Sequence, residues 1–146
     1  IQKLVRLMGE ETRARGITLS VKSAQDALMV PMDVDKLQQA LINIVKNAME
    51  SIDGTGSIDI VLEKQPGDRA VVRISDTGAG LAPGEIEKIF DPDYTTKEKG
   101  LGLGLPIAYE IIRGHGGTID VQSSQGRGTT FEISLPAQPA PAAAPR

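Results

Sequence analysis

Twice along this chain, an amphipathic helical pattern is followed by two alternating segments that a turn connects. In the first unit, a helix predicted over 34–52 precedes "SIDIVLE" and "RAVVRISD"; in the second, "LPIAYEIIRGH" precedes "GGTIDVQSS" and "GTTFEISLP". Such alternation predicts strands that are buried on one face only. Because each unit must bury one helix face and one sheet face, the two units should share a core. We therefore predict an α+β fold, a two-layer α/β sandwich with helices packed on one face of a mixed, mostly antiparallel sheet.

The two ends of the chain differ from its centre. Residues 1–16 show helical spacing of apolar residues and stop at Gly16, so we interpret them as the end of a helix that enters from upstream. "ITLSV" then alternates like a strand. The segment 137–146, "AQPAPAAAPR", has no periodicity and is predicted to be a disordered tail. The domain itself is expected over 17–136.

Composition excludes several classes of site. The chain has 146 residues, 40% of them hydrophobic, which suits one domain with a core. It has no cysteine and one histidine, so disulfides, thiolate chemistry and multi-histidine metal sites are excluded. A net charge of −3 argues against a nucleic-acid partner. No signal peptide or run of membrane-spanning length is recognised, and we expect a cytoplasmic location, with any membrane attachment in parts outside this chain.

The helix over 34–52 carries two asparagines. Asp33 is placed to cap its N-terminus. Asn43, Asn47 and Glu50, at i, i+4 and i+7, share a face roughly opposite the apolar stripe. A solvated polar face is the ordinary interpretation of any one of them. Two asparagines in mid-helix are unfavourable for helix formation, however, and amide oxygens can ligate Mg²⁺, so a metal-binding role is the alternative.

The segment "ISDTGAGL" places a carboxylate at the end of a strand. Asp76 is followed by Gly78 and Gly80. A carboxylate beside a tight glycine turn can accept a hydrogen bond from an exocyclic amino group while the turn admits a flat ring. The alternative is a plain turn in which Asp76 caps its own backbone.

The segment "KGLGLGL" brings three glycines directly before a helix that has Pro106 in its first turn. Successive N–H groups of Gly100, Gly102 and Gly104 can form an anion-binding concavity at the helix N-terminus. A hinge is the alternative. The run is not a dinucleotide fingerprint, since Ile107 stands where the third glycine belongs, and the chain has no P-loop Gly-Lys-Ser/Thr.

Taken in order, these segments resemble the ATP-binding catalytic domain of bacterial two-component histidine kinases, in the superfamily shared with gyrase-type ATPases and heat-shock chaperones. Five blocks from about residue 36 to 136 carry the resemblance: "QALINIVKNAMESI", "ISDTGAGL", "IEKIFDPDYTTKEKG", "GLGLGLPIAYEIIRGHGG" and "GRGTTFEISLP". The "TTK" at 95–97 is similar to that of nitrogen-regulation-type kinases.

The resemblance implies a base-binding set. Asp76 would bind the adenine amino group, and Gly78 and Gly80 would shape the floor beneath the base. Thr129 would join Asp76 through water at the purine edge.

It also implies residues for the phosphates and Mg²⁺. Asn47 would ligate Mg²⁺, and Asn43 would support the triphosphate and the metal shell. Phe90, with the loop from about 81 to 100, would form a mobile lid over ATP, and Lys97 in that lid is the candidate cation for the phosphate tail. The phosphate-binding stretch comprises Gly100, Leu101, Gly102, Leu103 and Gly104.

The resemblance implies transfer of the γ-phosphoryl group of ATP to a histidine on an adjacent dimerisation and phosphoacceptor domain. Where the ATPases of the superfamily have a glutamate that activates water, this chain has Asn43, which cannot act as that base. Residues 1–16 would end the helical hairpin of that domain, the full-length protein would be a homodimer, and a response regulator would be its partner. His115, at a helix end, is interpreted as a C-terminal cap and not as the acceptor.

Two other functions share these motifs. Asp93 replaces an aromatic residue of the usual pattern, which keeps open a nucleotide-sensing module without transferase activity. Leu101 replaces a threonine of that pattern, so a hydroxyl near the phosphates is lost. A serine kinase of the anti-sigma-factor type is the other alternative.

Overall fold

A five-stranded sheet forms one layer of the molecule. The computed structural model describes residues 2–23, 28–92 and 104–139. The strand order is β1-β3-β4-β6-β5, with β1 parallel to β3 and every other pair antiparallel. The strands are β1 (Ile17–Ser23), β3 (Gly56–Gln65), β4 (Arg69–Asp76), β5 (Thr118–Ser124) and β6 (Gly128–Pro136).

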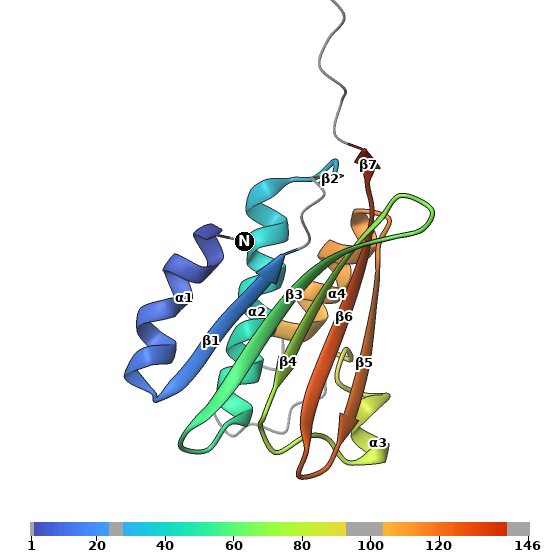
Figure 1. The fold of residues 1–146 in the computed structure, drawn as a ribbon. Helices are drawn as coiled ribbons and strands as arrows, with labels where there is room; N and C mark the ends of the chain where they lie inside the picture. Colours follow the sequence, from blue (N-terminus) through green and yellow to red (C-terminus); the bar gives the residue numbers. More distant parts are fainter. Residues whose placement is uncertain (1, 24–27, 93–103, 140–146) are drawn as a thin grey trace, which may run out of the picture.

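Three helices form the second layer, on one face of the sheet (Figure 1). They are α1 (Gln2–Ala14), α2 (Val34–Ser51) and α4 (Gly104–Gly114), and the one-turn helix α3 (Pro83–Ile86) lies in the connection from β4 to α4. The predicted α+β sandwich, with helices on one face of a mixed and mostly antiparallel sheet, is confirmed. In the described part of the chain, no helix combines the length and the hydrophobicity that crossing a bilayer would need.

An aliphatic core fills the space between the layers. Ile44 and Ala48 of α2 are fully buried, as are Ile74 of β4 and Phe131 and Ile133 of β6. Full burial of an Ile or Phe side chain contributes roughly 1.5–3 kcal/mol, so this seam between α2 and the central strands is the main apolar contribution to stability.

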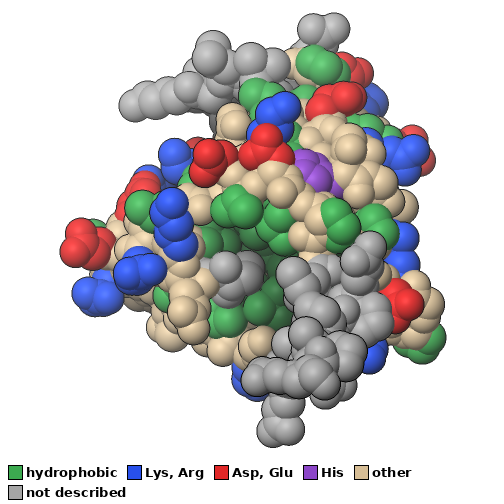
Figure 2. Space-filling view, turned by 90° about the horizontal axis from the view of Figure 1, so that it is seen from above, with side chains coloured by type: hydrophobic (Ala, Val, Ile, Leu, Met, Phe, Trp, Pro, Cys, Tyr) green, Lys and Arg blue, Asp and Glu red, His purple; other side chains and the backbone are tan. Residues whose placement is uncertain are grey.

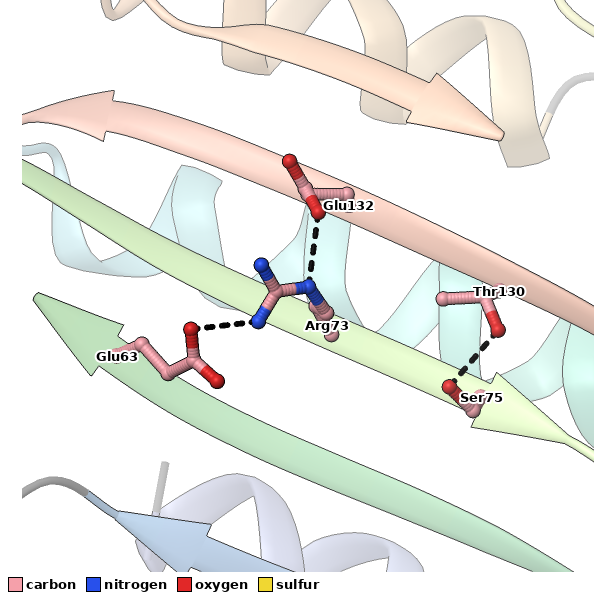
Figure 3. Close-up of polar contacts among 5 residues, drawn as sticks. All are labelled: Glu63, Arg73, Ser75, Thr130 and Glu132. Carbon is pink, nitrogen blue, oxygen red and sulfur yellow. Dashed lines mark hydrogen bonds and ion pairs between the residues drawn. The ribbon is translucent and has the colours of Figure 1, made fainter. Parts of the chain in front are cut away.

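The opposite face of the sheet is mostly polar, although Val71 of β4 is buried there, because successive side chains of a strand point to opposite faces. Arg73 of β4 lies between two carboxylates, 2.6 Å from Glu63 of β3 and 2.8 Å from Glu132 of β6 (Figure 3). Ser75 and Thr130 form the next cross-strand pair, with their hydroxyl oxygens 2.9 Å apart. The same alternation turns Asp76, one residue later, toward the helical layer.

The ends of the chain depart from the sequence prediction. The predicted tail from 137 begins with ordered residues: Ala137 is buried and donates its N–H to the Asp68 carbonyl at 2.7 Å. A two-residue strand, β7 (Gln138–Pro139), then pairs antiparallel with β2 (Leu28–Met29). At the other end, Leu4 and Met8 of α1 belong to the core, so α1 is an integral part of this domain. Residues 140–146 lie outside the described residues.

His115 connects the C-terminus of α4 to the N-terminus of α2. Its Nδ1–H donates to the carbonyl of Ile111 at 2.7 Å, which confirms the predicted cap, and its Nε2 accepts the N–H of Asp33 at 2.9 Å. Asp33 in turn caps α2, as predicted, by accepting the N–H of Lys36 at 3.1 Å. Figure 2 looks onto this end of the molecule, where hydrophobic side chains gather in a hollow near the histidine.

We expect His115→Ala to destabilise the domain by about 1–2 kcal/mol, because the bond that joins α4 to α2 and the bond that caps α4 are both lost at a partly solvated site. Urea denaturation followed by circular dichroism measures the change, with Glu110→Ala on the exposed side of α4 as the control. Equal denaturation midpoints for His115→Ala and wild type would show that the connection contributes nothing to stability.

Candidate functional site

The centre of the site is a buried carboxylate with one oxygen unsatisfied. Asp76 ends β4 facing the helical layer and is only 6% exposed. Its Oδ1 accepts the Gly78 N–H at 2.8 Å and lies 3.2 Å from the Ser51 hydroxyl. Its Oδ2 is buried and has no hydrogen-bond partner within the described part of the chain. A buried acceptor without a donor is costly, so an Oδ2 in this position indicates a ligand that brings an N–H or O–H group.

The environment of Asp76 sets the direction in which its pKa moves. Burial raises the pKa of the Asp76 carboxyl above its ordinary value, and the hydrogen bonds that Gly78 and Ser51 donate to Oδ1 lower it only in part. The ionised carboxylate is therefore held at a cost to the stability of the free protein. A donor from a ligand would offset that cost.

The glycine turn after Asp76 is clamped on two sides. The N–H of Ala79 donates to the Ser51 carbonyl at 3.0 Å, and the carbonyl of Ala79 accepts the N–H of Gly126 at 2.6 Å. A Cβ on Gly78 would collide with Ser51, and one on Gly80, whose φ is +72°, would collide with the carbonyl of Ser124. Glycine is needed here for close backbone packing. The alternative of a plain turn therefore accounts for the hydrogen bond from Gly78 to Oδ1, but it does not explain why Oδ2 is buried.

Thr129 lies directly opposite Asp76 in the pairing of β4 with β6 and is buried. Its hydroxyl oxygen is 2.8 Å from that of Ser123, which also donates to the Gly128 carbonyl at 3.0 Å and accepts the Leu81 N–H at 2.7 Å. Because Ser123 has one hydroxyl proton and gives it to Gly128, Thr129 must donate to Ser123. Sequence reasoning missed Ser123, which anchors both Thr129 and the start of the segment after the turn.

Helix α2 carries the predicted asparagines. Asn43 donates its Nδ2–H to the carbonyl of Gly104, the first residue of α4, at 3.1 Å. Its amide oxygen therefore faces away from that bond. Asn47 is half-buried one turn further along, and Ser51, one more turn along, contacts Asp76. Helix α2 thus reaches both the N-terminus of α4 and the buried carboxylate.

The first part of the predicted lid is anchored. The ring of Phe90 packs 5.2 Å from Tyr109 of α4 and 6.4 Å from Phe131 of β6, centroid to centroid, and the neighbouring Ile89 is buried. Phe90 therefore packs at the edge of the core, within the segment for which the resemblance implies a mobile lid. Five other predicted site residues lie outside the described residues: Lys97, Gly100, Leu101, Gly102 and Leu103.

The site therefore combines three chemical features. They are a buried acceptor at the end of β4, amide side chains on α2, and the N-terminus of α4 at Gly104, whose first N–H groups carry partial positive charge. No cluster of three or more His, Cys, Asp or Glu side chains suited to a metal occurs within 2–23, 28–92 and 104–139. Mg²⁺ is commonly held by one or two protein oxygens and substrate phosphates, so the amide of Asn47 fits that ion when it arrives with a polyphosphate.

Comparison with known proteins gives consistent matches. Residues 32–139 match the family described as "Histidine kinase-, DNA gyrase B-, and HSP90-like ATPase". The sensor histidine kinase ZraS of Salmonella typhimurium is 36% identical over 132 residues, which cover 90% of this chain and 28% of ZraS. The chain therefore spans less than a third of this curated relative.

Solved structures agree with the sequence matches. The catalytic domain of the histidine kinase ThkA, in a nucleotide-free form, superposes with a TM-score of 0.83 at 32% identity, covering 92% of this chain and 88% of that one. ThkA in complex with the response regulator protein TrrA superposes with a TM-score of 0.78 at 30% identity, covering 92% and 38%. Full-length ShkA in complex with AMPPNP gives 0.87 at 27% identity, covering 97% and 30%.

The raised pKa predicts a trade-off at Asp76. A carboxyl whose pKa is higher in the folded than in the unfolded state contributes stability below its unfolded pKa, and that contribution is lost as the pH rises through the folded pKa. Asp76→Asn removes the buried charge, so the variant should have a higher Tm than wild type at pH 7.5 in the absence of ligand. The difference should shrink as the pH falls toward the pKa of Asp76.

Thermal unfolding between pH 4.5 and 8 measures this difference. Asp59→Asn, at an exposed position of β3, is the matched control. An Asp76→Asn variant with a lower Tm than wild type at pH 7.5 would contradict the account of the buried charge.

Proposed function

The chain belongs to the histidine kinase-, DNA gyrase B- and HSP90-like ATPase family, and we propose that it is the catalytic domain of a sensor histidine kinase. In this proposal it binds Mg²⁺–ATP and transfers the γ-phosphoryl group to a histidine on an adjacent dimerisation and phosphoacceptor domain. The observation that carries the proposal is Oδ2 of Asp76 at the end of β4, which is buried and has no donor in the part of the chain that the structure describes.

Recognition of the base rests on Asp76. The adenine amino group is a donor, so it would supply the hydrogen bond that Oδ2 lacks. Guanine has a carbonyl oxygen at the corresponding position, which would place two acceptors against each other. Thr129, opposite Asp76, would complete the purine edge through water, and the clamped turn at Gly78 and Gly80 would form the floor.

The triphosphate would lie between α2 and the start of α4. N–H groups in the first turn of α4, with the glycine run before it, would bind phosphate oxygens. Asn47 would offer its amide oxygen to Mg²⁺, which supplies charge neutralisation between phosphates when it is bound. Asn43 would hold the N-terminus of α4 in place through its bond to Gly104. Lys97 remains the proposed cation for the phosphate tail.

The reaction proposed is phosphoryl transfer by positioning. Phosphoryl transfer requires alignment and charge stabilisation more than covalent chemistry from the protein. Asn43, which stands where the water-activating glutamate of related ATPases is expected, is a neutral amide and cannot accept a proton from water. Its N–H₂ group is also committed to Gly104. Bound ATP would therefore be held for a nucleophile from outside the domain.

The acceptor and the partners follow from the same proposal. We propose that α1 continues from the helical hairpin bearing the acceptor histidine, in a homodimeric and cytoplasmic arrangement. His115 is not that acceptor, because both of its ring nitrogens are engaged: Nδ1–H donates to Ile111 of α4, and Nε2 accepts the N–H of Asp33. A response regulator would receive the phosphoryl group next, as the complex of ThkA with TrrA suggests.

The proposal predicts slow ATP hydrolysis by the isolated domain and efficient labelling of an added partner. The domain is incubated with radiolabelled ATP and Mg²⁺, with and without the phosphoacceptor hairpin of the same protein. The hairpin should become labelled, with phosphate that is labile in acid and stable in base, as phosphohistidine is. Asn47→Ala should reduce the labelling by at least about tenfold, because the loss of one metal ligand weakens charge neutralisation in the transition state.

Asp53→Ala, at an exposed position after α2, is the control and should label the hairpin normally. Rapid ATP hydrolysis without a hairpin would contradict the transferase assignment. ATP binding without any labelling would favour the nucleotide-sensing module, and acid-stable label would favour a serine kinase.

A further inference from the structure

Ser51, the last residue of α2, contacts the turn after Asp76 in three ways. Its hydroxyl lies 3.2 Å from Oδ1 of Asp76. Its carbonyl accepts the N–H of Ala79 at 3.0 Å. Its side chain also occupies the space that a Cβ on Gly78 would need. The end of α2 is therefore fitted to this turn by side chain, backbone and packing together.

The single proton of the Ser51 hydroxyl has two acceptors within reach. The carbonyl of Ala48 lies 2.8 Å away, and this back-bond within the helix is the ordinary contact of a serine near a helix end. Oδ1 of Asp76 is the second acceptor, at 3.2 Å. When Asp76 is ionised, a hydrogen bond to the carboxylate is charge-assisted, and such bonds are roughly twice as strong as neutral ones. When Asp76 is protonated, that advantage disappears and the hydroxyl should return to Ala48.

We propose that Ser51 is a positioning residue, which with the Gly78 N–H fixes Oδ1 of Asp76 so that Oδ2 faces the nucleotide base. The inference rests on the proposed function, since the base is adenine only if Asp76 binds it. One donor on Oδ1 leaves the carboxylate able to turn about its terminal bond, which has a broad torsional minimum, whereas two donors restrict it. Pre-positioning avoids ordering the carboxylate at the moment of binding.

The position of Ser51 also links the proposed metal ligand to the proposed base contact. Asn47 lies one turn before Ser51 on the same face of α2. The hydroxyl of Ser51 then links the helix that carries the proposed metal ligand to the strand that carries the base contact. A shift of α2 along its axis would change the distance between Asn47 and Asp76. The hydrogen bond from Ser51 at the end of the helix restricts such a shift.

Ser51→Ala is a clean test of this role. The bond from Ala79 goes to the backbone carbonyl and survives the change, and alanine is the best helix former. The matched control is Ser75→Ala, which removes a hydroxyl one residue from Asp76 but on the opposite face of the sheet, where Ser75 pairs with Thr130 (Figure 3). Both variants should fold.

The first measurement does not depend on nucleotide. The pKa of the Asp76 carboxyl is determined by carbon-detected NMR in the free protein. Hydrogen bonding from Ser51 lowers the pKa of Asp76, so Ser51→Ala should raise it, and Ser75→Ala should leave it unchanged. The second measurement is ATP affinity against pH. Ser51→Ala should weaken binding by about threefold to tenfold near neutral pH, with a larger loss in mild acid where the carboxyl protonates earlier.

The outcomes separate this inference from the function on which it rests. An unchanged pKa of Asp76 in Ser51→Ala overturns the positioning role, whatever happens to affinity. A raised pKa with unchanged ATP affinity also overturns the positioning role. In that case Ser51 does bond to Asp76, and the proposed contact between Asp76 and the base is the step that is wrong. The inference is supported if Ser51→Ala lowers ATP affinity in the wild-type protein but causes no further loss in the Asp76→Asn variant, because the two residues then act through one contact.

Discussion

The rest of this structure depends on a carboxylate buried at the end of β4, which has donors for one oxygen and, among the described residues, none for the other. Burial raises the pKa of Asp76, and the hydrogen bonds that Gly78 and Ser51 donate to Oδ1 compensate only in part. The free protein therefore holds a charged group in an unfavourable state at neutral pH. Glycine at 78 and 80 lets the following turn pack against α2 and the β5–β6 turn closely enough to keep water from Oδ2. The buried Oδ2 of Asp76 lowers the stability of the free protein, and a hydrogen-bond donor from a ligand would restore that stability.

The architecture explains why this atom and the asparagines of α2 occur together. β4 lies at the centre of the sheet, so its end is enclosed on both sides by β3 and β6. Helix α2 crosses the inner face and ends at Ser51, against the turn that follows β4. One helix therefore connects Asn43, which holds the start of α4, to the residue that holds Asp76. The second helix-and-hairpin unit supplies Thr129 from the neighbouring strand.

Periodicity in the sequence was sufficient to predict the sandwich and to place Asp76 at the end of a strand. It could not reveal Ser51 or Ser123, because each acts through a tertiary contact between elements distant in sequence. The pairing of β2 with β7 was missed for a similar reason: two-residue strands have no period to detect. The family resemblance implied that Phe90 belongs to a mobile lid, and the structure packs its ring against Tyr109 and Phe131. The roles of individual site residues remain predictions.

The central claim is that Oδ2 of Asp76 accepts a hydrogen bond from the amino group of adenine. The most direct test compares ATP with purine riboside triphosphate, which has hydrogen in place of that amino group, by calorimetric titration against wild type and Asp76→Asn. Wild type should bind ATP at least about tenfold more tightly than the analogue, because the analogue leaves the buried charge without its donor. The difference should largely disappear in Asp76→Asn. Equal affinities of the wild-type domain for the two nucleotides would contradict the claim.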